Sequence, residues 1–135
     1  MVKLKELGQS WKKIGSQIEE SKRFLDEQKI DEALYFIWIA AENLVNCLKV
    51  TVNGIYLKEH RAKTDILKAY FAAGTLKKDY SRTFEKLSKY RIAAEFHPYT
   101  SIKRDYTKED VKRFLEEIEG LKAELSRILK ERGVL

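Results

Sequence analysis

Apolar residues recur along most of this chain at the three- and four-residue spacing of an amphipathic α-helix. In the first segment they lie 3, 4, 3, 4 and 7 positions apart, with Ser21 at the one omitted position and charged residues on the other faces. The stripe predicts a helix over about residues 3–28. Its members are Leu4, Leu7, Trp11, Ile14, Ile18 and Leu25.

The second segment, about residues 31–52, is apolar on nearly every side. Residues 33–41 are nine consecutive apolar positions, and polar pairs bound this run on both sides. Nine residues are too few to cross a bilayer, which takes about twenty. Such a helix is either the centre of a bundle or also faces a partner subunit. Because 135 residues would leave part of it uncovered, we expect a homodimer.

Three further helices follow, and capping and breaking residues set their expected boundaries. No segment shows strand-like alternation, so the pattern predicts a single all-α domain over residues 1–135. We expect an antiparallel up-and-down bundle of four long helices and one shorter helix. The boundaries are Asp31 as N-cap of the second helix, Asn53-Gly54 at its end, a third helix over about 58–73 closed by Gly74, a fourth from Asp79 or Ser81 to about Phe96, and a fifth from a capping-box-like Thr107–Asp110 to Gly133.

Composition agrees with this class and excludes some chemistry. The chain is 44% hydrophobic and 36% charged, with six glycines, which is typical of a compact helical protein. Cys47 is the single cysteine, and with two histidines it cannot form a zinc site of the usual Cys/His kind. The first residues lack the apolar core of a signal peptide, so we expect a cytoplasmic protein.

The net charge of +6 is concentrated in one part of the chain. Residues 53–104 carry twelve Lys/Arg and five Asp/Glu, a balance of +7, whereas residues 1–52 carry eight of each and residues 105–135 carry seven and eight. Such a surplus would attract a polyanion such as RNA through counterion release. A solvated basic surface is the alternative interpretation.

The basic segment contains the chain's most distinctive stretch, residues 90–99. The inner stripe of the fourth helix runs through Tyr80, Phe84 and Leu87 to Arg91, which stands where the period predicts an apolar residue. A permanently charged guanidinium there needs an anion, a carboxylate such as Glu42 or Glu95, or a solvent-filled groove. These alternatives stay open from the sequence.

His97 lies six positions after Arg91, which on one continuous helix would place the two side chains on different faces. Pro98 disfavours the α region for His97, so the helix should end near Phe96 and the imidazole can turn back toward the arginine. Together with Tyr99, such a helix end could bind a phosphodiester. Alternatively, His97 merely caps the last carbonyls of the helix.

The spacing Arg91, His97, Tyr99 at the end of the penultimate helix of a small bundle resembles the signature of the HEPN (higher eukaryotes and prokaryotes nucleotide-binding) family. The apolar second helix with Ala41-Glu42-Asn43-Leu44, the segment from Asn53-Gly54 to His60 and the long last helix resemble the family as well. The resemblance covers essentially the whole chain. The motif is loose, and its specificity comes from its place in the bundle.

This resemblance implies a homodimer in which two Arg-His pairs line one cleft. It implies a metal-independent RNase toxin, without a cofactor, paired with a minimal nucleotidyltransferase as antitoxin. His97 would act as general base or acid and Arg91 would stabilise the phosphorane, while Tyr99, Glu42 and Lys89 would contact the substrate. The alternatives are a non-catalytic HEPN-like module that binds a nucleotide or a nucleotidyltransferase, and a structural helical adaptor.

Overall fold

The computed structural model describes residues 4–53, 60–96, 99–100, 103–133 and 135. Five α-helices and no strand occur in these ranges, so the predicted all-α helical bundle is confirmed. The shorter helix expected from the sequence is α3, with 13 residues. The helices are α1 (Leu4–Asp26), α2 (Ile30–Asn53), α3 (His60–Ala72), α4 (Ser81–Phe96) and α5 (Lys108–Glu131).

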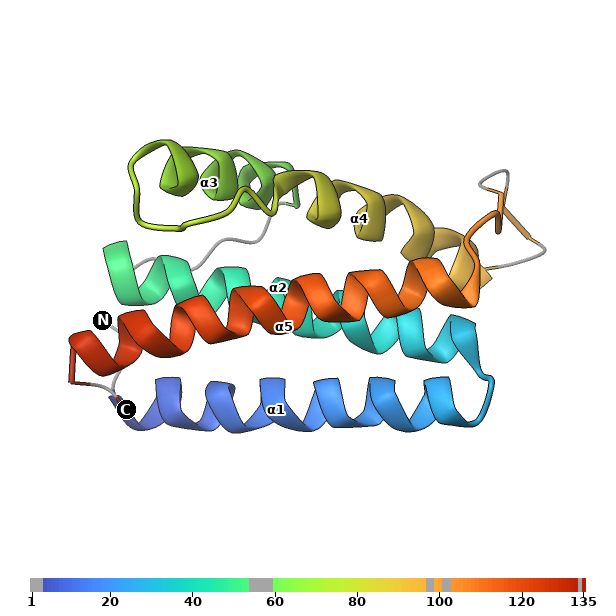
Figure 1. Ribbon diagram of the computed structural model, residues 1–135, viewed down its shortest axis with the longest axis horizontal. Coiled ribbons are helices and arrows are strands. Elements are labelled where there is room, and N and C mark those ends of the chain that lie inside the picture. Colours follow the sequence, from blue (N-terminus) through green and yellow to red (C-terminus); the bar gives the residue numbers. More distant parts are fainter. Residues whose placement is uncertain (1–3, 54–59, 97–98, 101–102, 134) are drawn as a thin grey trace.

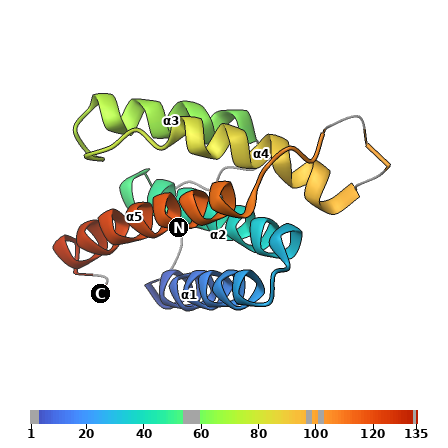
Figure 2. The ribbon, with the colours of Figure 1, turned by 45° about the vertical axis from the view of Figure 1, so that its right-hand side comes forward.

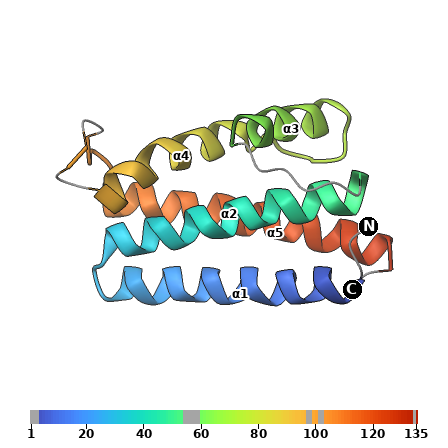
Figure 3. The same ribbon diagram turned by 180° about the vertical axis from the view of Figure 1, so that it is seen from behind.

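The helices form three layers around α2. α1 lies on one side, α2 and α5 lie side by side in the middle, and α3 and α4 follow one another along the other side (Figures 1 and 2). α1 and α2 run antiparallel, and α4 runs antiparallel to both α2 and α5 (Figures 1 and 3). α2 contacts each of the other four helices. It is therefore the central helix, one of the two positions that its composition predicted.

Burial along α2 follows from this central position. Eleven of its residues are buried, from Ala33 to Val50. Over an 18-residue window α2 has a mean hydropathy of 1.3, so by length and composition it could cross a membrane, but 61% of that window is buried inside the bundle. The core helix of a soluble protein passes the same test, so this property does not distinguish a buried core helix from a membrane-spanning one.

The start of α2 differs from the prediction. α2 begins at Ile30, so Asp31 lies within the first turn and is not the residue before it. Its carboxylate instead accepts hydrogen bonds from Arg104 Nε, at 2.7 Å, and from the Tyr106 hydroxyl. Burial and this carboxylate raise the pKa of Tyr106. Asp31 thus joins α2 to the segment that precedes α5, a contact between residues more than seventy positions apart that local sequence rules do not predict.

The predicted start of α5 is confirmed in detail. The Thr107 hydroxyl accepts a hydrogen bond from the Asp110 N–H at 3.2 Å, and the Asp110 carboxylate accepts one from the Thr107 N–H at 2.9 Å. This reciprocal pair is a capping box with aspartate in place of glutamate. The backbone hydrogen bond lowers the pKa of Asp110. At the other helix ends, Gly74 (φ 79°) and Gly133 (φ 72°) adopt the left-handed conformation that the sequence suggested.

Candidate functional site

Arg91 lies where the period of α4 placed it, on the face turned toward α2. Phe84 and Leu87 on the same face are fully buried, and Arg91 follows one turn after Leu87. Its side chain is 25% exposed. A charged group thus continues an apolar stripe, as predicted.

An aromatic ring of the central helix packs against this guanidinium. The Arg91 guanidinium carbon lies 5.3 Å from the centroid of the Trp38 ring. Trp38 is itself buried and packs against Phe84, with 5.0 Å between ring centroids. This cation–π contact orients the planar guanidinium at a partly desolvated position. The role of Trp38 was not predicted, because it is one of nine consecutive apolar residues and no local pattern indicates which of them faces a cation.

The polar contacts of Arg91 are weaker than its aromatic one. Arg91 Nη1 lies 4.0 Å from Glu95 Oε2, at the outer limit of an ion pair. Arg91 Nε is buried and has no hydrogen-bond partner among the described residues. Among the described residues, the ion pair expected as the alternative to a functional role is this long contact with Glu95, and Glu42 pairs with Lys63. The described part of the fold leaves one donor of Arg91 unused.

Glu42 and Asn43 interrupt the apolar surface of α2, and each has a partner on a neighbouring helix. Glu42 Oε2 accepts a hydrogen bond from Lys63 Nζ of α3 at 2.9 Å, and the Lys63 side chain is 3% exposed. Asn43 Nδ2 donates to Gln17 Oε1 of α1 at 3.0 Å. These contacts hold the helices together. They make Glu42 part of the packing between α2 and α3 in addition to a candidate for substrate contact.

The other candidates do not gather around Arg91 within the described residues. Lys89 is exposed, and its Nζ lies 5.7 Å from the centroid of the Tyr90 ring. Two positions correspond to about 200° around a helix, so Lys89 and Arg91 lie on different faces of α4. Tyr99 is 92% exposed, and its N–H donates to the Phe96 carbonyl at 2.6 Å. His97 and Pro98 lie outside the described residues, so the expected approach of His97 to Arg91 stays a prediction.

A groove of about 320 Å³ lies beside the end of α4 that carries Arg91. Its walls come from the start of α2 and the end of α4. Three carboxylates line it, so it would repel a phosphodiester. Among the described residues no cluster of three or more His, Cys, Asp or Glu could hold a metal ion. The lining residues are Asp31, Glu32, Tyr35, Phe36, Ala94 and Glu95.

Comparison with known proteins does not assign a family. No protein-family model and no curated protein matches the chain. The described fold and site define a small all-α protein of five helices with a partly buried arginine at the end of its fourth helix. The HEPN resemblance rests on the motif residues and their place in the bundle.

Proposed function

We propose that this chain is a metal-independent endoribonuclease of the HEPN kind, the toxin of a pair with a minimal nucleotidyltransferase. Arg91 and His97 are its catalytic residues. The observation that carries the proposal is Arg91 itself, a permanent cation that stacks on Trp38 and has a buried Nε without a partner among the described residues. The basic surplus of residues 53–104 supports an RNA substrate, because it raises the local concentration of a polyanion.

The reaction follows from the chemistry of the two side chains. His97 removes the proton of a ribose 2′-hydroxyl, and the oxygen attacks the adjacent phosphorus. Arg91 stabilises the negative charge that develops on the phosphorane oxygens. The bond from phosphorus to the 5′-oxygen breaks, which leaves a 2′,3′-cyclic phosphate and a 5′-hydroxyl. The contact with Trp38 fixes the guanidinium plane before the substrate binds, so less rotamer entropy is lost in the complex.

A homodimer completes this site in the proposal. Phe96, the last residue of α4, is 49% exposed. The HEPN resemblance implies a dimer with two Arg91 side chains in one cleft, and in the proposal that contact covers the exposed ring of Phe96. Lys89 and Tyr99 are exposed, and in the proposal they contact parts of the RNA strand away from Arg91, since Lys89 lies on a different face of α4.

The test is cleavage of single-stranded RNA by the purified protein in EDTA, with detection of the cyclic phosphate product. We expect Arg91→Ala and His97→Ala each to lower the rate by about 100-fold or more. Lys130→Ala, which removes an exposed cation in the last turn of α5, is the control and should keep the parent rate. Undiminished cleavage by both site variants would rule out the assignment. Salt-dependent RNA binding without cleavage would favour the non-catalytic module instead.

A further inference from the structure

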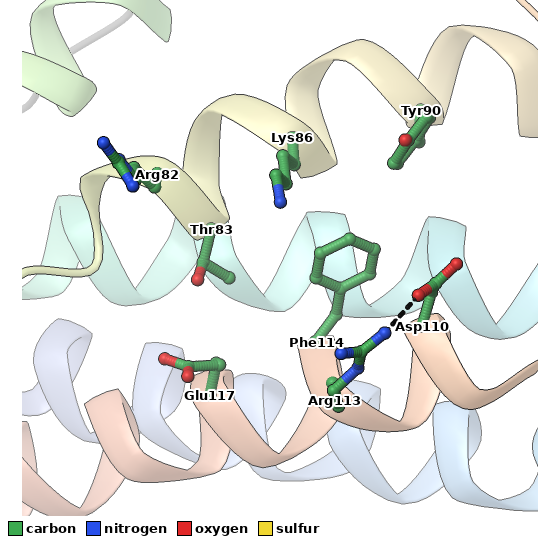
Figure 4. Close-up of a pocket in the computed structure, with 8 residues that line it drawn as sticks. All are labelled: Arg82, Thr83, Lys86, Tyr90, Asp110, Arg113, Phe114 and Glu117. Carbon is green, nitrogen blue, oxygen red and sulfur yellow. Dashed lines mark hydrogen bonds and ion pairs between the residues drawn. The ribbon is translucent and has the colours of Figure 1, made fainter. Parts of the chain in front are cut away.

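A second cleft, of about 230 Å³, lies between α4 and α5 (Figure 4). Tyr90 lines it, and Arg91 is the next residue of the same helix. Successive helical residues point about 100° apart, so the cleft and the candidate site lie on different faces of α4. The cleft is therefore a separate surface from the one that Arg91 occupies.

The α4 side of the cleft presents two cations without a close ion pair among the described residues. Arg82 and Lys86 stand one turn apart on α4. Neither forms an ion pair within 4 Å of a described carboxylate, and Arg82 interacts with Asp79 beyond that distance. Figure 4 shows the Lys86 ammonium and the Thr83 hydroxyl pointing toward α5. By contrast, Arg113 on the α5 side is neutralised by Asp110, with 2.5 Å between Nη2 and Oδ1. The two positive charges without a close ion pair, those of Arg82 and Lys86, therefore lie on the α4 wall.

The α5 side presents an acceptor that the fold does not use. Glu117 Oε1 forms an ion pair with Lys78. Its second oxygen, Oε2, is buried and has no hydrogen-bond partner among the described residues. A buried acceptor without a donor costs about 1–3 kcal/mol, and more when it is charged. The Glu117 side chain as a whole is 28% exposed, so it can turn Oε2 toward a donor that a ligand supplies, which would recover that cost.

The space between these walls is floored by aromatic rings. The Phe114 ring lies between the helices in Figure 4, and the Tyr90 ring centroid lies 6.2 Å from it. The volume is below the roughly 300–1,000 Å³ of pockets for drug-sized ligands, so only a small ligand fits. One that spans the cleft needs an anionic group at the α4 wall and a hydrogen-bond donor at the α5 wall.

We propose that this cleft binds a small phosphomonoester whose ring carries hydroxyl groups, with its phosphate on Arg82 and Lys86 and a hydroxyl donating to Glu117. A bare anion satisfies the two cations but cannot at the same time donate a hydroxyl to Glu117 on the opposite wall, and a neutral sugar satisfies only Glu117. A hydroxylated phosphomonoester satisfies both walls. Charge-assisted hydrogen bonds of this kind are about twice as strong as neutral ones.

The test is calorimetric titration of the full chain with ribose 5-phosphate, inorganic phosphate and ribose. We expect ribose 5-phosphate to bind at least about tenfold more tightly than either of the other probes, the equivalent of one lost charge-assisted contact. AMP keeps the ribose 5-phosphate and adds a base. Equal affinity for AMP would assign recognition to the sugar phosphate, and tighter binding of AMP would assign it to a nucleotide.

Two variants separate the walls of the cleft. Arg82→Gln/Lys86→Gln should weaken ribose 5-phosphate by about tenfold or more, while Lys12→Gln/Lys13→Gln, the same charge change on exposed positions of α1, should not. Glu117→Gln should weaken ribose 5-phosphate but leave inorganic phosphate unchanged or tighter, since it removes a like charge. Arg91→Ala should have no effect here, which separates a failure of this proposal from a failure of the RNase assignment.

Three results would overturn the proposal. The first is no binding of any probe to the parent protein. The second is inorganic phosphate binding as tightly as ribose 5-phosphate, which would reduce the cleft to a cationic surface. The third is equal loss of affinity in the α1 control pair. Melting temperatures of all variants near the parent value ensure that each difference reports on the cleft.

Discussion

The polar side chains inside α2 and the arginine inside α4 occupy similar positions but have different surroundings. Glu42 and Asn43 interrupt an apolar helix, and each is hydrogen-bonded to a neighbouring helix, Glu42 to Lys63 and Asn43 to Gln17. Arg91 interrupts an apolar stripe as well. Its described contacts are an aromatic face and a carboxylate oxygen at 4.0 Å, and its Nε has no partner among the described residues.

Glu42 and Asn43 therefore form hydrogen bonds that connect helices, whereas the Arg91 Nε forms none among the described residues. Burying a polar group costs free energy unless a partner compensates. Glu42 and Asn43 have such partners, so their removal should destabilise the bundle. The described contacts of Arg91 offset little of the free energy that its partial burial costs. A charged residue held in such a position is a candidate for a function outside folding. Substitutions of the polar residues of α2, of their partners and of Arg91 test this difference. The expected changes in the free energy of unfolding range from about 2 kcal/mol to a few tenths of a kcal/mol.

The largest effect is expected for Lys63→Met. The substitution removes the buried ammonium that donates to Glu42 Oε2 at 2.9 Å. Removing one partner of a buried ion pair costs about 3–5 kcal/mol, and because the Glu42 side chain is 24% exposed we expect a loss of about 2 kcal/mol. Urea denaturation measures the free energy of unfolding. Lys68→Met, an exposed lysine of the same helix, is the matched control, and an equal effect of both substitutions would show that the Glu42–Lys63 pair does not stabilise the bundle.

A smaller effect is expected at the contact between α1 and α2. Asn43→Ala leaves the buried Gln17 without the amide donor that now lies 3.0 Å from its oxygen. A typical net hydrogen bond contributes about 1 kcal/mol. We therefore expect a coupling energy of about 1 kcal/mol in a double-mutant cycle of Asn43→Ala and Gln17→Ala. Additive single effects would show that the two amides are not coupled.

The smallest effect concerns the thiol of the central helix. Burial raises the pKa of Cys47 to about 11, above its value in an unfolded chain. The folded state therefore disfavours the thiolate, so this contribution to stability is complete below the unfolded pKa and is lost as pH rises toward 11. Relative to Cys47→Ala, the parent should lose about 0.3 kcal/mol between about pH 7 and about pH 8.5. A difference that does not change with pH would mean that the thiol is less buried than its packing on α2 implies.

The pattern of the sequence predicted the fold well, because helix spacing and caps are local properties. The stripes of α1 and α5, the capping box at Thr107 and the glycines after α3 and α5 are each encoded within a few residues. The role of Asp31 was predicted wrongly for the opposite reason. Its partners Arg104 and Tyr106 are distant in sequence, and their contact with it depends on how the helices pack.

The candidate site was predictable only in part, again because of its long-range contacts. The period of α4 was enough to place Arg91 in a buried stripe. The Trp38 ring against it and the Lys63 partner of Glu42 come from helices 53 and 21 positions away in the chain, and no local pattern encodes either. The α4–α5 cleft escaped for the same reason, since Lys86 and Glu117 look like ordinary surface charges until the two helices are placed side by side.

The most direct test of the central claim is the stability of Arg91→Met. Methionine keeps the unbranched stem out to the position of Nε, can contact the Trp38 ring through its sulfur, and removes the charge and the hydrogen-bond donors. The lost cation–π contact and the gained apolar burial nearly cancel, so the free energy of unfolding should stay within about 1 kcal/mol of the parent value while RNA cleavage is lost. A loss of about 3 kcal/mol or more, comparable to breaking a buried ion pair, would show that Arg91 is a structural residue and contradict the account.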